Sequence, residues 1–369
     1  MPFFKSLILS LMLVVSNQAW SQAKVVFQVE TLATGLGVIW AMEFLDEHTL
    51  IFTVRSGRVG IMDSETQDVR WLSGLPPIHT QGQGGLLDVK ASPNYLQDQW
   101  LYFTYSHPLA NSAVTALARA QLDGDKLVNW QDLILTQSSS NSHQHWGSRI
   151  AFDHQGHVFF GIGDRGIRDE SQNTLSHTGS ILRLTLDGDI PQDNPFVNNP
   201  DVLDEIWSFG HRNPQGMAFD SARQQLWSNE HGPRGGDEIN LIERGQNYGW
   251  PEVSQGKEYW GPVAIGATHK DGMIDPIKVF TPSIAPGSLL VYSGRAFPQW
   301  QGHFFSGALA LRHLNRVVID QQYKAVEEER LLEELNERIR ALAEDTAGRI
   351  YFSTDSGQIK RLVPKSDSR

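Results

Sequence analysis

Cysteine is absent from the 369 residues of this chain, and acidic residues outnumber basic ones. Without cysteine the protein has no disulfide, no zinc site built on thiolates and no cysteine nucleophile, so its stability must come from burial and bound ions. Lysine and arginine together number 31 against 42 aspartates and glutamates, which gives a formal net charge of −11. That charge disfavours binding to nucleic acid or anionic lipid and fits a small or neutral partner better.

Long hydrophobic runs are also missing. The first segment carries one charge, Lys5, followed by an apolar run from Leu7 to Val15 and by small residues up to Ala23. This order is typical of a secretory signal peptide, which we place at residues 1–23. The run is too short for a lasting transmembrane helix, and no later segment approaches the required length of about 20 apolar residues. We expect a soluble, periplasmic or secreted protein with one domain over residues 24–369.

Two common enzyme motifs are missing as well. No Gly-x-Ser-x-Gly sequence is present, so serine hydrolysis lacks its usual scaffold, and there is no phosphate-binding loop. The segment from Gly161 to Gly166 superficially matches a dinucleotide fingerprint. It follows a predicted hairpin and has no strand–helix–strand unit around it, so we set this match aside.

A repeated unit runs along most of the chain. Each copy has an apolar triplet, a polar turn with Asp or Gly, a second apolar run, a Gly-containing turn and a further strand-like run. The copies begin near Ala41, Leu87, Arg149, Gly216, Leu289 and Ala341. This spacing is typical of propeller blades with long inserted loops, so the sequence predicts an all-β, six-bladed β-propeller. The strand-like segment from Val25 to Val29 is expected to close the ring against the last blade.

One segment conflicts with this prediction. Residues 325–340 are rich in Glu, Leu and Arg and have the composition and spacing of an amphipathic helix. The conflict matters because Arg338 and Arg340 share a face only in a strand, whereas in a helix they point about 200° apart. We expect any helix to end before Arg338.

Loops near the third and fourth predicted blades carry groups suited to catalysis. His145 precedes the third blade, and Asp164 follows its second strand-like run, so both side chains are expected at one face. A carboxylate bonded to one imidazole nitrogen fixes the tautomer and leaves the other nitrogen to act as a base. Arg212 and Asn213 stand in a Gly- and Pro-containing loop that is predicted to open on the same face.

The segment from Glu230 to Asn240 is rich in oxygen ligands. A Gly-Pro pair at residues 232 and 233 can direct successive backbone carbonyls outward, and the carboxylates of Asp237 and Glu238 follow. Hard oxygen donors of this kind suit calcium. A turn that merely connects two strands is the alternative for each of these groups.

Taken in order, the motifs resemble those of the soluble quinoprotein sugar dehydrogenases that use pyrroloquinoline quinone (PQQ), in particular the aldose sugar dehydrogenase branch. The resemblance covers nearly the whole chain from Gly37 onward. Its most specific pieces are residues 82–87 (GQGGLL), His145-x-x-x-Arg149, residues 210–216 (GHRNPQG), 229–233 (NEHGP), 237–242 (DEINLI) and 247–251 (NYGWP). The resemblance implies a six-bladed propeller that oxidises aldose sugars to lactones with PQQ and calcium.

The resemblance also implies roles for individual residues. His145 would accept the proton of the anomeric hydroxyl while hydride passes to C5 of the quinone, and Asp164 would orient His145. Arg212 would polarise the quinone oxygen that gains charge. Gln83 and Asn213 would complete the site as hydrogen-bonding partners of the sugar and of the cofactor, respectively.

Charged groups of the cofactor imply a further set of residues. Its three carboxylates call for cations, which the resemblance identifies as Arg312, Arg338 and Arg340. The carbonyls of Gly232 and Pro233 would hold a catalytic calcium ion, and Glu238 with the backbone of Tyr248 would hold a structural one. The aromatic pair that narrows the sugar pocket of glucose-specialised members is not visible around residues 280–286, so we expect a broader pocket that accepts several aldoses.

Two other functions remain open on the sequence alone. A calcium-dependent hydrolase of the lactonase type on the same propeller would need acidic and amide side chains around a central metal, without arginines for a tricarboxylate. A propeller that only binds a partner is the second alternative. The electron acceptor, and the choice between a monomer and a homodimer, also stay open.

Overall fold

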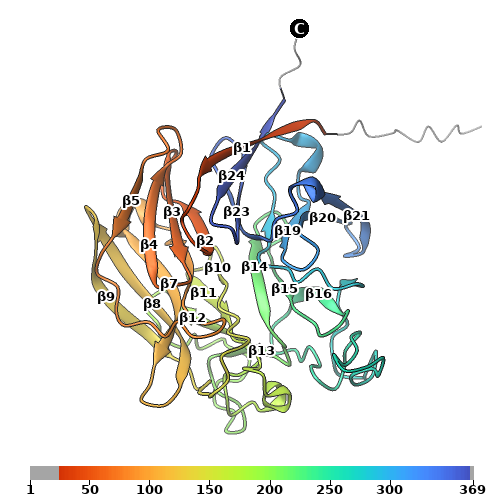
Figure 1. The fold of residues 1–369 in the computed structure, drawn as a ribbon. Coiled ribbons are helices and arrows are strands. Elements are labelled where there is room, and N and C mark those ends of the chain that lie inside the picture. Colours follow the sequence, from red (N-terminus) through yellow and green to blue (C-terminus); the bar gives the residue numbers. More distant parts are fainter. Residues whose placement is uncertain (1–24, 366–369) are drawn as a thin grey trace, which may run out of the picture.

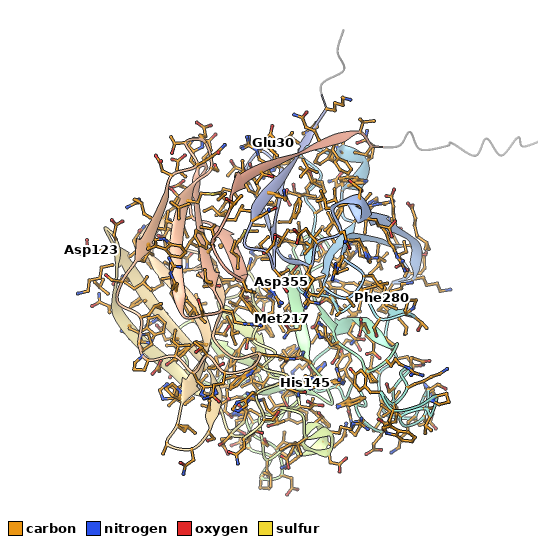
Figure 2. The ribbon with its side chains drawn as sticks, viewed as in Figure 1. Glu30, Asp123, His145, Met217, Phe280 and Asp355 are labelled. Atoms are coloured by element: carbon orange, nitrogen blue, oxygen red, sulfur yellow. The ribbon has the colours of Figure 1, made fainter. Side chains whose placement is uncertain are left out.

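Six four-stranded antiparallel sheets make up the computed structural model, which describes residues 25–365 (Figure 1). The predicted signal peptide at residues 1–23 lies outside the described residues. In five blades the strands follow chain order, from the inner to the outer strand. Neighbouring innermost strands contact one another around the ring, so the sheets surround a common centre near Met217 (Figure 2). The fold is the predicted six-bladed β-propeller.

The first three blades cover residues 39–209. Their strands are β2 (Ile39–Phe44), β3 (Thr49–Val54), β4 (Arg58–Asp63) and β5 (Val69–Leu72) in blade 1; β6 (Leu86–Ala91), β7 (Trp100–Pro108), β8 (Ala113–Asp123) and β9 (Lys126–Leu135) in blade 2; and β10 (Ile150–Phe152), β11 (His157–Gly161), β12 (Ser180–Thr185) and β13 (Ile206–Phe209) in blade 3. Blade 2 also carries the short helix α1 (Tyr95–Asp98), and η1 (Arg168–Gln172) is a 3-10 helix between β11 and β12.

The remaining blades cover residues 214–364. Their strands are β14 (Pro214–Asp220), β15 (Gln225–Glu230), β16 (Asp237–Ile242) and β17 (Lys278–Phe280) in blade 4; β18 (Leu290–Val291), β19 (Phe304–Ala308), β20 (His313–Ile319) and β21 (Ala325–Leu331) in blade 5; and β22 (Ile339–Glu344), β23 (Ile350–Thr354) and β24 (Ile359–Pro364) in blade 6. Two 3-10 helices, η2 (Pro298–Trp300) and η3 (Glu333–Leu335), lie between them. None of the helices within residues 25–365 is long and apolar enough to span a membrane.

The ring closes through β1 (Phe27–Ala33), which pairs antiparallel with β24 and forms the outer edge of blade 6. Phe27 stands opposite Pro364 and Glu30 opposite Arg361 in this register. The closing strand predicted from residues 25–29 is therefore confirmed, with its bounds moved toward the C-terminus. The six predicted blade starts also coincide with the six innermost strands.

The predicted helix pattern over residues 325–340 is wrong. Residues 325–331 form β21, the outer strand of blade 5, and η3 is all that remains helical. The glutamates of β21 are stabilised in the strand by pairing with β20, because Arg316 of β20 donates hydrogen bonds to both Glu327 and Glu329. Tertiary pairing thus overrides the local helix propensity.

A buried cation connects four blades at the centre of the ring. The guanidinium of Arg149 donates to Asp88 at 3.0 Å, to the carbonyl of Gln215 at 3.0 Å, and to the carbonyls of Trp40 and Gly287 at 3.2 and 2.6 Å. Burial lowers the pKa of Arg149, and the charge of Asp88 opposes that shift. A buried charge is tolerated when it is paired and hydrogen-bonded. Arg149 therefore joins the blades at the centre of the ring through these hydrogen bonds.

Candidate active site

His145 and Asp164 meet at one end of the propeller, as the sequence predicts. His145 lies in the loop before β10, and Asp164 follows β11. Nδ1 of His145 is 2.5 Å from Oδ1 of Asp164. The second carboxylate oxygen accepts the indole N–H of Trp250 at 2.9 Å, and the backbone N–H of Gly166 donates to Oδ1 at 2.7 Å. The carboxylate is therefore held from three sides.

These contacts decide the ionisation of Asp164. Burial on its own would raise the pKa of this carboxyl, but the hydrogen bond from His145 and the positive charges of His145 and Arg212 outweigh it, so that the pKa is lowered. At neutral pH Asp164 is a carboxylate and accepts a hydrogen bond from Nδ1–H of His145. The other ring nitrogen, Nε2, then carries the free lone pair that a general base requires.

Glycines allow the two loops to approach this closely. A Cβ on Gly163 would lie 2.4 Å from the carbonyl oxygen of His145, and a Cβ on Gly147 would lie 2.6 Å from that of Gly161. The backbone N–H of His145 donates to Oε1 of Gln83 at 2.9 Å, which fixes the loop from the other side. The position of the imidazole is therefore set by backbone contacts.

Arg212 is buried in the loop between β13 and β14. Its Nη1 donates to the carbonyls of His231 and Gly232 at 2.9 Å each, and its guanidinium carbon lies 5.3 Å from the ring centre of Trp250. Its backbone N–H donates to the carboxylate of Glu230 at 2.6 Å. These contacts hold the cation close enough to Asp164 to stabilise the carboxylate.

Beneath Arg212, carboxyl groups crowd around a small cavity. Glu230, Glu238, Gly232 and Tyr248 are among the residues that line it. Burial, together with the charge of Glu230, raises the pKa of Glu238 to about 8. A cation placed here would relieve that repulsion. Among the described residues, however, no group of three or more His, Asp or Glu side chains is arranged to hold a metal ion.

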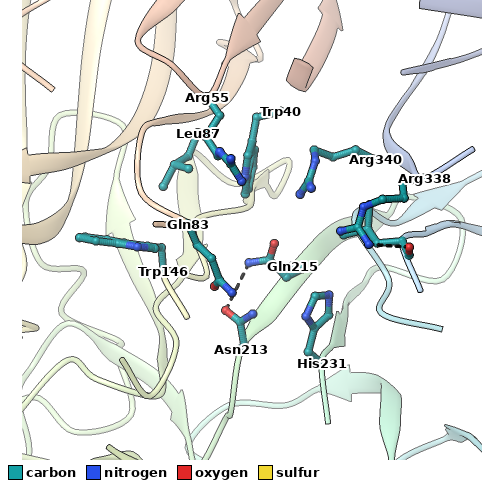
Figure 3. A pocket seen from close by; sticks show the side chains of 11 residues that line it. Trp40, Arg55, Gln83, Leu87, Trp146, Asn213, Gln215, His231, Arg338 and Arg340 are labelled. Atoms are coloured by element: carbon teal, nitrogen blue, oxygen red, sulfur yellow. Dashed lines mark hydrogen bonds between the residues drawn. The ribbon is translucent and has the colours of Figure 1, made fainter. Parts of the chain in front are cut away.

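A second, larger cavity lies next to the His145 loop, because Trp146 and Gln83 line it (Figure 3). Its lining includes Gln83, which accepts the backbone N–H of His145, and Asn213, which accepts the backbone N–H of Gly147 at 3.1 Å. The opposite wall carries Arg338 and Arg340. The residues that line the cavity are Trp40, Arg55, Gln83, Leu87, Trp146, Asn213, Gln215, His231, Leu309, Arg338 and Arg340.

Arg338 and Arg340 lie just before and within β22, and they share a carboxylate. Arg338 donates to Asp355 at 2.7 Å, and Arg340 donates to the same side chain at 2.6 and 2.9 Å. This agrees with the prediction that both cations extend from one face of an extended segment. The two arginines hold the pKa of Asp355 below its usual range despite burial, which acts in the other direction.

The structure does not bring Arg312 to this cavity. Its side chain is exposed and donates to the side-chain oxygen of Asn336 at 3.2 Å. Pro233 lines neither cavity described above, and its carbonyl accepts the hydroxyl of Ser283 at 3.0 Å. Gly232, Glu238 and Tyr248 do come together.

Sequence reasoning missed several residues of the site. Trp250 belongs to the motif at residues 247–251, but nothing in the spacing of that motif indicates a bond to Asp164. His231 lines the larger cavity, where burial and the charge of Arg212 lower its pKa to about 3 and keep it neutral. Arg55 and Asp355 each begin a Ser-Gly turn in the sequence, and only the fold places them beside β22.

Comparison with known proteins gives consistent matches. The sequence profile of the Glucose / Sorbosone dehydrogenase family matches residues 36–361. Aldose sugar dehydrogenase YliI of Escherichia coli strain K12 is 35% identical over 360 residues, which are 95% of this chain and 96% of that protein.

Two crystal structures of aldose sugar dehydrogenases superpose closely. The soluble enzyme of Escherichia coli in its apo-form has a TM-score of 0.88 at 34% identity, covering 92% of this chain and 100% of that one. The PQQ-bound form of the enzyme from Streptomyces coelicolor has a TM-score of 0.77 at 26% identity, covering 92% of this chain and 98% of that one.

Proposed function

The chain belongs to the glucose/sorbosone dehydrogenase family and is an aldose sugar dehydrogenase, and we propose that it oxidises aldoses at the anomeric carbon with PQQ, using His145 as the base. One observation carries the proposal. The loop that holds the His145–Asp164 pair borders a cavity lined by arginines, because Trp146 and Gln83 line that cavity and Gln83 accepts the backbone N–H of His145. The product would be the lactone of the sugar.

The cavity fits a planar tricarboxylate. Guanidinium groups form one wall, and the neutral amides of Asn213 and Gln215 form another. Arginine is well suited to carboxylates because its planar fork donates two parallel hydrogen bonds. Arg338 and Arg340 would hold carboxylates of PQQ, and Asn213 would donate a hydrogen bond to the cofactor. When bound, PQQ supplies the two-electron acceptor, at C5, for the hydride that leaves the anomeric carbon.

His145 handles the proton of the reaction. Its Nδ1–H donates to Asp164, so Nε2 accepts the proton of the anomeric hydroxyl as the carbon–oxygen bond gains double-bond character. Asp164 stays ionised and stabilises the imidazolium that forms. A general base of this kind contributes about 10²- to 10⁴-fold to the rate. Gln83 is placed to position both the histidine loop and a sugar hydroxyl.

Arg212 would stabilise negative charge on the oxygen that is reduced. Its guanidinium is fixed by the carbonyls of His231 and Gly232, so little reorganisation is needed when charge develops. Fixed positive groups in a site of low water content give one of the largest electrostatic contributions to catalysis.

Two positions in the site offer oxygen ligands for calcium: neutral backbone carbonyls at the first, and carboxyl groups at the second. The carbonyls of Gly232 and Pro233 are neutral and already accept protein hydrogen bonds, so a catalytic calcium ion there needs oxygens from the cofactor as well. Glu238 and Tyr248 line the small cavity with Glu230, where carboxylate repulsion favours a cation. Bound calcium would supply Lewis-acid polarisation at the first position and structural stabilisation at the second.

Reconstitution of the purified protein tests this function. The protein without cofactor should be inactive, and PQQ with calcium should give aldose-dependent reduction of an artificial electron acceptor. Calorimetry with saturating calcium should show PQQ binding. Absence of binding would contradict the proposal, and lactone hydrolysis without PQQ would support the lactonase alternative instead.

A further inference from the structure

Three guanidinium groups line the larger cavity, and Arg55 is the one that the sequence did not indicate (Figure 3). Arg55 directly follows β3 in blade 1, whereas Arg338 and Arg340 belong to blade 6. The three side chains therefore reach the cavity across the boundary between two blades. The cavity encloses about 700 Å³, its open mouth included.

Partners are distributed unequally among these cations. Asp355 accepts hydrogen bonds from both Arg338 and Arg340, and Arg338 also donates to the carbonyl of Leu309 at 2.8 Å. The side chain of Arg55 has no hydrogen bond or ion pair with any residue in the described range 25–365. Burial, followed by repulsion from Arg340, lowers its pKa. Arg55 is therefore the one of the three whose positive charge no acidic group pairs with directly.

The backbone of Arg55 is nevertheless held firmly. Its N–H donates to the carbonyl of Val38 at 3.0 Å. A Cβ on Gly85 would lie 1.9 Å from the carbonyl oxygen of Arg55, so only glycine allows the two segments to pack at this distance. Asp355 is the anion whose charge acts on Arg55, but it is already bonded to Arg338 and Arg340, and a partly buried cation without a direct partner is unfavourable. An anion in the cavity would provide one.

We propose that Arg55 is a cofactor-binding residue that pairs with a carboxylate of bound PQQ and supplies the third cation of the pocket. This inference rests on the proposed function, and it replaces the expected contribution of Arg312, whose side chain is exposed and bonded to Asn336. Asp355 already neutralises one of the two charges of Arg338 and Arg340. Arg55 thus brings the positive charge that a tricarboxylate still requires.

Replacement of Arg55 gives a direct test in the purified protein with calcium present. Arg55→Met should raise the Kd for PQQ about 10- to 150-fold, the loss expected for a hydrogen-bonded charge pair. Arg55→Lys should show a smaller loss, because it keeps the charge but not the planar fork. Arg58→Met is the matched control, since Arg58 is exposed and stacks on Trp71 outside the cavity, and its Kd should equal that of the wild type.

Thermal unfolding provides a second readout that a merely structural arginine would not produce. Without cofactor, Arg55→Met should unfold at the same or a higher temperature than the wild type, because repulsion from Arg340 is removed. With PQQ, the wild type should gain more thermal stability than the variant. The trimethyl ester of PQQ should remove the difference in affinity between them, because it has no carboxylate charge.

The outcomes separate this inference from the proposed function. If the wild type binds no PQQ, the proposed function fails. If the wild type binds PQQ and Arg55→Met and Arg55→Lys bind it with the same Kd, the role of Arg55 is overturned. A variant that loses stability without cofactor by as much as it loses with cofactor would also overturn it.

Discussion

The imidazole of His145 is set by contacts that leave one nitrogen for chemistry. Asp164 binds Nδ1, Trp250 and Gly166 hold Asp164, and Gln83 holds the backbone of His145. A base that is already oriented needs little rearrangement before proton transfer. The role of His145 is therefore expected to appear in turnover and not in cofactor affinity.

Replacement of His145 by alanine should leave the Kd for PQQ nearly unchanged and lower kcat about 10²- to 10⁴-fold, because a base acts in the transition state. Stopped-flow reduction of the bound quinone by excess aldose would measure this step. His154→Ala is the control, since His154 is exposed and bonds to Ser221. A variant that changes only KM would contradict the assignment.

At this scale the sequence predicted the residues that stand in conspicuous loops. The motif with His145 and the motif with Arg212 stand in loops that glycine or proline marks, and Arg338 and Arg340 were identified through the resemblance to the quinoprotein sugar dehydrogenases. Arg55 and Asp355 were missed because each begins an ordinary Ser-Gly hairpin turn, a pattern that does not distinguish a site residue from a solvent-exposed turn residue. Their place beside the cavity becomes apparent only from the fold, which brings blades 1 and 6 together there.

Among the strands, too, some could be predicted from local sequence and one could not. The six innermost strands were predictable because each combines an apolar run with a turn, whereas β21 was not. Its glutamates favour a helix locally, yet Arg316 in β20 pairs with Glu327 and Glu329 on one face of the strand. Lys278 of blade 4 pairs with Glu328. Partners so distant in sequence leave no local pattern.

The loop between β11 and β12 is expected to tolerate no side chain at Gly163. In Gly163→Ala the new Cβ would stand 2.4 Å from the carbonyl oxygen of His145 and 2.9 Å from Oδ1 of Asn213. Because both contacts belong to the site, kcat should fall, and the free energy of unfolding should drop by about 1–3 kcal/mol. Denaturant unfolding and steady-state kinetics would measure both effects.

Gly261→Ala is the matched control for that substitution. A Cβ on Gly261 would have no atom within 4 Å, and its φ does not favour glycine, so the change should be neutral or slightly stabilising. Full activity in Gly163→Ala would show that the two loops move apart without consequence. In that case the close approach of the loops is not what positions His145.

The whole molecule depends on closing its ring at blade 6, where β1 pairs with β24. Phe27 packs against Phe297 and Trp300, and Leu32 is buried in the core. Glu30, labelled on the closing strand in Figure 2, pairs with Arg361. The same blade carries Arg338 and Arg340, two of the three cations of the cavity. The thermal stability of the protein and its affinity for the cofactor are therefore both expected to depend on the pairing of β1 with β24.

A protein that begins at residue 34 should test this coupling against one that begins at residue 25. Loss of β1 exposes the edge of β24 and removes the burial of Leu32, which contributes about 1.5–3 kcal/mol, together with the smaller contribution of the partly buried Phe27. Calorimetry should show a lower Tm, and light scattering should show association through the free edge. Because Asp355 and Arg340 lie in the loosened blade, the Kd for PQQ should rise too. An unchanged Tm would mean that the other five blades hold blade 6 in place without its closing strand. A lowered Tm with an unchanged Kd would mean that cofactor binding does not depend on the pairing of β1 with β24.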